Sequence, residues 1–247
     1  MSHLTNKNDA AVLATGATVP LMGVIMDDAA TLAATTLAAG YRHLICPPAA
    51  LPAVRAAVAQ SETKDVFVTL LLSAPAASTL AQVAQAALPV DLLVIDSAAA
   101  ADRQAAAAAC ARHQAKAWGA LGEPAEAERP ASSLTLLPLG VTAQFAPVVQ
   151  AAQAAGRPVA TNLPFGRGDL ALLRPLRRMA ERYGKTPAQI VVRWLLQRGI
   201  LPWLPAANAQ ELSAWGDVFD FELSFHDTQV LEALDGRPMA PRKHRRH

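Results

Sequence analysis

Short apolar runs of strand length alternate with Ala-rich helical segments along the whole chain, and this alternation limits the fold more than any other feature. Eight runs are long and apolar enough to be buried strands, at residues 21–26, 42–45, 66–72, 91–95, 115–120, 134–138, 158–162 and 201–204. Strands that alternate with helices form parallel sheets, and eight such strands close into a barrel. We therefore expect a (β/α)8 TIM barrel, which the 247 residues are enough to build.

Helices are expected between these strands, at residues 28–39, 48–60, 78–87, 98–111 and 145–155. The first should end at Gly40, because glycine readily takes the left-handed conformation that ends many helices. The clearest helix start is Thr186, followed by Pro187 and by Gln189, which together have the pattern of a capping box. Ser224 begins a similar pattern before a terminal helix.

The charge of the chain is concentrated at its end. The last residues, 241–247, hold four of the 22 basic side chains, and the other 18 stand against 20 acidic ones. The body is close to neutral, so we expect no nucleic-acid partner. We expect one barrel domain over residues 1–240, with the Pro- and Ser-rich residues 122–133 as a surface connection, and a basic tail to which no role is assigned.

Two cysteines, Cys46 and Cys110, are too few for a disulfide scaffold, and no His, Cys or Asp spacing is typical of a metal site. The sequence begins without a secretory pattern and contains no apolar run of membrane-spanning length. These observations indicate a cytoplasmic protein that contacts no membrane and binds no metal.

Several motifs resemble the aldo-keto reductases, a family of NADPH-dependent barrels. They follow the family's order along the chain: LATGATVPLMG at 13–23, AGYRHL at 39–44, FVT at 67–69, VDLLVID at 90–96, GKTPAQIVVRWLLQRGI at 184–200 and VFDFELS at 218–224. The resemblance implies an aldo-keto-reductase barrel with some shortened loops and a site at the carboxyl ends of its strands. Its opening segment implies a hairpin before the first strand.

Members of this family reduce a carbonyl with NADPH and use a Tyr as proton donor, a Lys and an Asp that tune it, and a His that orients the substrate. Carried over position by position, the Asp falls on Ile45, the Tyr on Ala50, the Lys on Leu71 and the His on Asp96. Proton donation needs a group with a matched pKa within hydrogen-bond reach. We therefore expect the family's reduction to be lost.

The positions that hold the cofactor in the family differ as well. The family's Ser-Asn pair falls on Leu121 and Gly122, and the Tyr that stacks on the nicotinamide falls on Asn162. The phosphate-binding Pro-Lys-Ser falls on residues 205–207, which read PAA, so the lysine is missing.

The next two positions of the family's cofactor site, an Arg and an Asn, fall on Glu211 and Trp215. A carboxylate in place of arginine repels a phosphate. Only Gly166, Arg167 and Gly168 remain as weak candidates for contact with a pyrophosphate. We expect no cofactor, or NADP if the family activity survives.

Asp96 is the best candidate for a catalytic residue. The resemblance places it beside Ile45, Leu71 and Ala50, where a carboxylate among apolar side chains is suited to act as a general acid or base. The alternative is that Asp96 caps a helix that starts near Ser97.

Other residues are expected to line the same pocket or its rim, namely Asp27, Cys46, Trp118 and Asn162. Strand alternation predicts that Ile45 and His43 face the barrel interior, with Cys46 directed toward the helices or the rim. Cys46 is then either a small buried apolar residue or a nucleophile.

Three functions remain open from the sequence. The first is a non-redox subunit that binds a small molecule or a protein partner. The second is a cofactor-independent lyase, isomerase or cyclase that uses Asp96, and the third is a surviving NADPH-dependent reductase. The sequence identifies neither the ligand nor the partner, because a fold hosts many functions and only the site decides among them.

Overall fold

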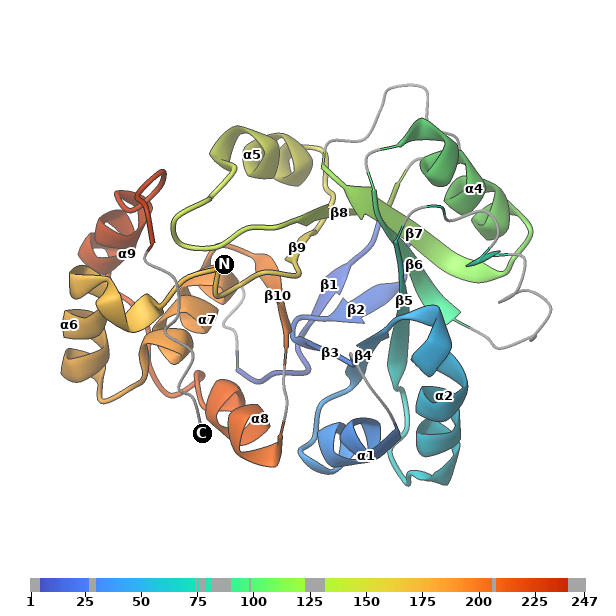
Figure 1. Cartoon of the computed structure of the whole chain (residues 1–247), viewed down its shortest axis with the longest axis horizontal. Helices are drawn as coiled ribbons and strands as arrows, with labels where there is room; N and C mark the ends of the chain where they lie inside the picture. Colours follow the sequence, from blue (N-terminus) through green and yellow to red (C-terminus); the bar gives the residue numbers. More distant parts are fainter. Residues whose placement is uncertain are drawn as a thin grey trace.

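Eight parallel strands close into a barrel in the computed structural model of the chain (Figure 1). In barrel order they are β3 (Gly23–Ile25), β4 (His43–Cys46), β5 (Phe67–Ser73), β6 (Val90–Asp96), β7 (Ala115–Leu121), β8 (Leu134–Leu137), β9 (Val159–Thr161) and β10 (Ile200–Leu204), with β10 paired to β3. All eight expected strands are present, and sequential strands are neighbours throughout. The expected (β/α)8 barrel is confirmed.

The structure describes residues 5–26, 30–73, 75, 79–80, 90–97, 99–122, 132–205 and 208–239. Asp27, most of the helix expected at 78–87 and the basic tail at 241–247 lie outside these residues. Among the described residues, no helix combines the length and the apolar character that crossing a membrane requires.

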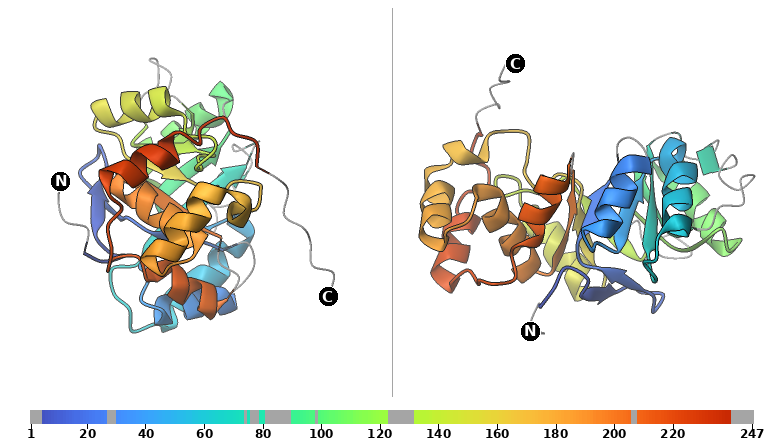
Figure 2. Two further views of the ribbon diagram at one scale, coloured as in Figure 1. Left: turned by 90° about the vertical axis from the view of Figure 1, so that its left-hand side faces the viewer. Right: turned by 90° about the horizontal axis from the view of Figure 1, so that it is seen from below.

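Helices surround the barrel on its outer side (Figures 1 and 2). They are α1 (Ala30–Ala38), α2 (Leu51–Gln60), α4 (Ala100–Ala111), α5 (Ala146–Ala154), α6 (Arg174–Tyr183), α7 (Pro187–Gln197), α8 (Ala209–Gly216) and α9 (Phe225–Glu232). Two short 3-10 turns, η1 (Pro48–Ala50) and η2 (Leu170–Leu172), precede α2 and α6. Helix α6 was not expected from the sequence pattern, and it packs beside α9 at one end of the molecule.

The expected helix boundaries are confirmed where the sequence carries a capping signal. The Oγ1 of Thr186 accepts from the Gln189 amide at 3.2 Å, and the Gln189 Oε1 accepts from the Thr186 amide at 2.8 Å, which completes the capping box of α7. The Ser224 hydroxyl accepts from the Asp227 amide at 3.2 Å and caps α9. Gly40 follows α1 with a φ of +82°.

An antiparallel hairpin, β1 (Ala10–Val12) and β2 (Thr18–Pro20), precedes the barrel, as the resemblance implied. Its chain runs directly into β3. The Pro20 carbonyl at the end of this hairpin lies 3.3 Å from His43 Nδ1, so the hairpin contacts the barrel interior at the amino end of the strands.

The side chains that fill the barrel follow from strand register. A Cβ on Gly23 would lie 2.2 Å from Ile45 Cδ1 and 2.9 Å from His43 Nδ1, so these positions share one face. The His43 ring packs edge-on against Phe67 at 5.2 Å and Trp203 at 6.1 Å, which lie on the neighbouring strands β5 and β10. This face is the barrel interior, and His43 and Ile45 point into it as expected.

His43 is a fully buried, hydrogen-bonded imidazole. A carbonyl oxygen only accepts, so Nδ1 carries the proton and donates to Pro20, while Nε2 accepts from the Thr69 hydroxyl at 2.8 Å. Burial lowers the pKa of His43 to about 4, although the Pro20 carbonyl and the Asp91 carboxylate raise it. The imidazole is therefore neutral at physiological pH and joins the hairpin to β4 and β5.

Candidate functional site at the carboxyl ends of the strands

Four positions implied by the resemblance lie at or just beyond the carboxyl ends of β4, β5 and β6. Ile45 pairs with Thr69, Leu71 pairs with Val94, and Asp96 pairs with Ser73. Alternation from the inward-facing His43 and Ile45 carries Leu71 and Asp96 to the same inner face. Ala50 follows β4 at the end of η1, which packs against β5.

These positions offer little proton chemistry apart from Asp96. Ile45 and Ala50 are buried, whereas Leu71 and Asp96 are partly exposed. Three of the four side chains are hydrocarbon and neither donate nor accept a proton. Any acid-base step at this cluster would have to use Asp96.

Asp96 has a polar neighbour across the barrel mouth. The Asn162 Nδ2, just after β9, donates to Asp96 Oδ2 at 3.5 Å, although β7 and β8 lie between β6 and β9 in the barrel. The Asn162 Oδ1 is buried and has no hydrogen-bond partner among the described residues. The amide thus contacts the carboxylate across the barrel mouth through one long hydrogen bond.

Asp96 does not cap a helix. Helix α4 begins at Ala100, its N-cap is Ala99, and no side chain accepts a hydrogen bond there. The nearby Ser97 hydroxyl accepts from the Ala99 amide at 3.1 Å instead. The capping interpretation of Asp96 is therefore wrong, because the helix begins four residues beyond the carboxylate.

Cys46 is not a nucleophile in this structure. It is fully buried on the outer face of β4, toward Arg55 of α2. Burial raises the pKa of the Cys46 thiol to about 12, although Arg55 lowers it. Thiolate is the reactive form of cysteine, so Cys46 acts as a small buried apolar residue.

Trp118 does not belong to the pocket. It pairs with Leu93 on β6, and the next residue, Gly119, pairs with Val94 of the inner face. Alternation therefore turns Trp118 outward, where it is 1% exposed between the strands and the helix layer. The expectation for Trp118 is wrong because a one-residue offset along a strand reverses the face. Asp27 lies outside the described residues.

The turn with Gly166, Arg167 and Gly168 follows β9 and is closely packed. Gly166 has a φ of +64°, and a Cβ there would lie 2.6 Å from Met239 Cε. A Cβ on Gly140 would lie 3.3 Å from the Gly166 amide nitrogen. Arg167 is exposed, whereas Gly168 is buried. Met239 and Gly140 therefore pack closely against this turn at Gly166.

Trp215, the residue onto which the resemblance carries a cofactor-site Asn, belongs to an aromatic pair. Phe165, from the turn after β9, contacts Trp215 of α8 with ring centroids 5.2 Å apart and planes at 44°. At the start of α8, Asn208 Oδ1 accepts from the Glu211 amide at 2.9 Å. A carboxylate at Glu211, where the resemblance implies an arginine, does not suit a phosphate, which binds best to cations.

Sequence reasoning missed two features of the molecule. It placed Asp96 and Asn162 at the rim separately and gave no sign that they meet, because strand order alone separates them. It also missed a groove between α6 and α9. These two helices are far apart in sequence, and the residues that form hydrogen bonds between them are 44 and 45 positions apart.

Comparisons with known proteins agree with the motifs. No protein-family model matches the chain. An aldo-keto reductase of Mycolicibacterium smegmatis is 37% identical over 79 residues, which are 32% of this chain and 29% of that protein. An uncharacterized oxidoreductase of Schizosaccharomyces pombe is 34% identical over 88 residues, which are 36% of this chain and 32% of that protein. The match spans about a third of the length of these relatives.

Solved structures match over much more of the chain. A Bombyx mori aldo-keto reductase in complex with NADP has a TM-score of 0.82 and 19% identity, and the match covers 93% of this chain and 94% of that one. An aldo-keto reductase from Brucella melitensis has a TM-score of 0.81 and 20% identity, with 92% and 99% covered. The chain is similar in sequence to aldo-keto reductases over about a third of its length, and it shares their fold over more than nine tenths of it.

Proposed function

We propose that this barrel does not reduce carbonyls and instead binds a small molecule or a protein partner without redox chemistry. The observation that carries the proposal is the set of side chains at the strand ends, where Ile45, Ala50 and Leu71 stand in the positions that the resemblance gives to the proton-delivery residues.

Chemistry supports this proposal. Hydride transfer to a carbonyl leaves an alkoxide that must receive a proton, and a positioned acid of matched pKa commonly accelerates such a step about 10²–10⁴-fold. Hydrocarbon side chains supply no such proton. Asp96 is the carboxylate beside them, and among the described residues its side chain accepts from the Asn162 amide.

The surroundings of the implied nucleotide site support the same proposal. Trp215 stands where the resemblance implies a cofactor-site Asn and contacts Phe165, and Glu211 has a negative charge where the resemblance implies an arginine for a phosphate. The activities of the named relatives are their own, and these substitutions separate this chain from them.

Cofactor binding is tested first by thermal unfolding of the full chain with increasing NADPH, with an active aldo-keto reductase as the positive control. A ligand that binds only the folded state raises the melting temperature with its concentration. We expect no shift for this protein at NADPH concentrations that saturate the control. A shift that grows with NADPH concentration would contradict the loss of cofactor binding.

A second candidate function is cofactor-independent acid-base catalysis by Asp96, as in a lyase, isomerase or cyclase. The observation that favours it is the inward-facing Asp96 carboxylate, which lies at a strand end and is held by the Asn162 amide at 3.5 Å. Barrels place catalytic residues at such strand ends.

The two candidates are separated by a small-molecule screen that uses thermal shift, followed by NMR of each stabilising compound incubated with the protein. Binding without conversion supports the first proposal. Conversion that is lost in the isosteric Asp96→Asn variant, by about 10²-fold or more, supports the second. The Asp91→Asn variant is a matched control, because Asp91 pairs with Lys116 at 2.7 Å away from the mouth.

A further inference from the structure

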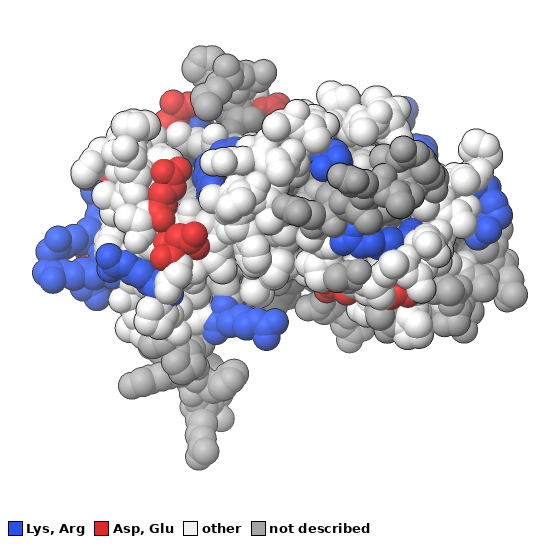
Figure 3. Space-filling model, turned by 90° about the horizontal axis from the view of Figure 1, so that it is seen from above, with Lys and Arg blue, Asp and Glu red and all other residues white. Residues whose placement is uncertain are grey.

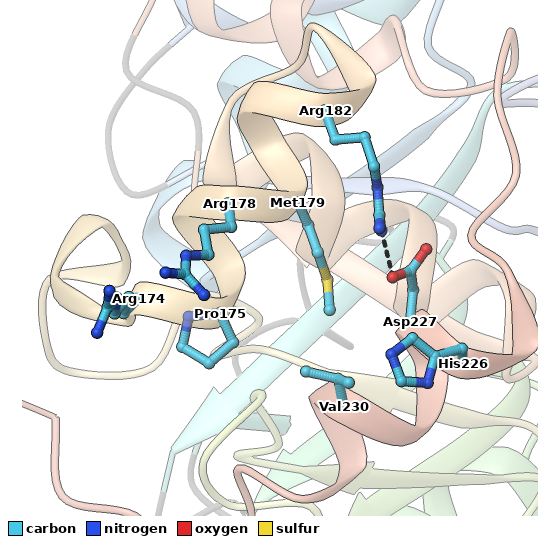
Figure 4. A pocket seen from close by; sticks show the side chains of 8 residues that line it. All are labelled: Arg174, Pro175, Arg178, Met179, Arg182, His226, Asp227 and Val230. Atoms are coloured by element: carbon cyan, nitrogen blue, oxygen red, sulfur yellow. Dashed lines mark hydrogen bonds and ion pairs between the residues drawn. The ribbon is translucent and has the colours of Figure 1, made fainter.

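A groove of about 390 Å³ lies between α6 and α9, in the outer helix layer (Figure 4). Eight residues line it: Arg174, Pro175, Arg178, Met179, Arg182, His226, Asp227 and Val230. Its volume is within the range of roughly 300–1,000 Å³ typical of small-molecule sites. The groove is separate from the site at the strand ends and shares no residue with it.

One end of the groove is positively charged. Arg174 and Arg178 are four residues apart on α6, so both lie on the same side of the helix, and Figure 4 shows both on the left-hand side of the groove. Neither makes a hydrogen bond or ion pair with any residue that the structure describes. The first turn of α6 contains no acidic residue that would offset them.

The other end of the groove is already neutralised. Arg182 forms an ion pair with Asp227, and the Tyr183 hydroxyl donates to the same carboxylate at 2.6 Å. Burial alone would raise the pKa of Asp227, but hydrogen bonds from Tyr183, Ser224 and Arg182 outweigh it and lower the pKa to about 2. The free positive charge therefore sits at the Arg174 and Arg178 end.

The middle of the groove is apolar. Figure 4 shows Pro175, the Met179 thioether and Val230 between the two charged ends. A methionine side chain adapts its shape to flat apolar ligands and makes favourable contacts with aromatic rings. In the face seen in Figure 3, Lys and Arg side chains also gather at the left-hand end, where α6 lies in Figure 1.

We propose that this groove binds a small amphipathic anion, with an apolar or aromatic body over Pro175, Met179 and Val230 and a phosphate or carboxylate head against Arg174 and Arg178. Guanidinium groups bind both kinds of head in a bidentate manner. The inference goes beyond the proposed function and does not depend on it, because the groove lies outside the barrel and shares no residue with the strand-end site.

The test uses three compounds with one apolar body: naphthyl phosphate, naphthoic acid and naphthol. Binding to the full chain is followed by fluorescence titration and by NMR of the compound. We expect one or both anions to bind at least about tenfold more tightly than naphthol, and the tighter anion identifies the preferred head. Since the arginines are exposed, added salt should weaken the binding of the anions and leave the affinity for naphthol unchanged.

Two variants of equal charge locate the site. Arg178→Gln removes a cation that lines the groove, and we expect it to lower the affinity for the preferred anion by about tenfold. Arg177→Gln is the matched control, because Arg177 lies on the same helix, is exposed, pairs with Glu181 at 4.0 Å and does not line the groove. It should leave the affinity unchanged.

Three results would overturn the proposal. The first is that neither anion binds at millimolar concentration, and the second is that naphthol binds as tightly as the anions. The third is that Arg177→Gln weakens binding as much as Arg178→Gln does. The last result would mean that the general charge of α6 attracts anions, with no defined site. Failure here leaves the strand-end proposal untouched, because NADPH binding and Asp96 are tested separately.

Discussion

At the scale of single residues, His43 gives the clearest prediction. Its folded pKa of about 4 lies below the ordinary value of 6.5. Between these values the unfolded chain binds more protons than the folded one, so folding stability falls as the pH falls. The contribution of neutral His43 to folding stability is complete above pH 6.5 and is lost progressively as the pH falls to about 4. It amounts to at most about 3 kcal/mol.

Urea unfolding at a series of pH values in this window measures the effect. The His43→Gln variant should be less stable at neutral pH, because Thr69 and Pro20 lose their partner, and its stability should change less on acidification. His113→Gln, at an exposed position, is the control and should keep the wild-type dependence. An equal pH dependence in His43→Gln and wild type would contradict the assignment.

Single residues also show where sequence reasoning stops. Alternation correctly turned His43 and Ile45 inward, because both lie on one short strand with a fixed period. The expectation for Trp118 was wrong because a step of one residue along a strand reverses the face, and the Asp96 cap was wrong because α4 begins later than its composition suggests. An alanine-rich segment carries no sharp start signal, so its first residue is poorly determined.

At the scale of elements, the capping box of α7 tests whether a short local sequence fixes the start of a helix. This helix is buried along most of its length and packs against β10 and α6, so its ends matter to the whole fold. Removing the Thr186 hydroxyl leaves the Gln189 amide without its acceptor. We expect Thr186→Ala to lower the free energy of unfolding by about 1 kcal/mol.

Chemical denaturation checks this expectation. Ser213→Ala, at an exposed position inside α8, removes a hydroxyl that caps nothing and should change stability by less than about 0.5 kcal/mol. If both substitutions have the same effect, the capping box contributes nothing specific to α7.

Elements also show why the groove could not be predicted. Helix α6 carries its arginines at positions that a sequence pattern assigns to solvent, and only its packing beside α9 brings Arg178 near Val230. A charged helix face is therefore ambiguous until its neighbour is known. The groove is a property of two elements together.

At the scale of the whole molecule, the order of the eight strands was predictable because parallel strands joined by helices have few possible arrangements. The motifs also predicted kinship with aldo-keto reductases, which the comparisons support. The contact of Asp96 with Asn162 was not predictable, since it depends on how the closed barrel brings β6 and β9 together at one end. The fold could be predicted because strands and helices alternate repeatedly along the sequence, whereas the site depends on a few individual side chains.

We propose that this barrel, which has the fold of the aldo-keto reductases, does not transfer hydride. The most direct measurement is NADPH oxidation, followed by absorbance, when the full chain is mixed with NADPH and a panel of aldehydes and ketones. With Ile45, Ala50 and Leu71 at the strand ends, we predict a rate equal to that of the protein-free blank for every compound. A rate that rises with protein concentration and saturates with any of the carbonyl compounds would contradict the account.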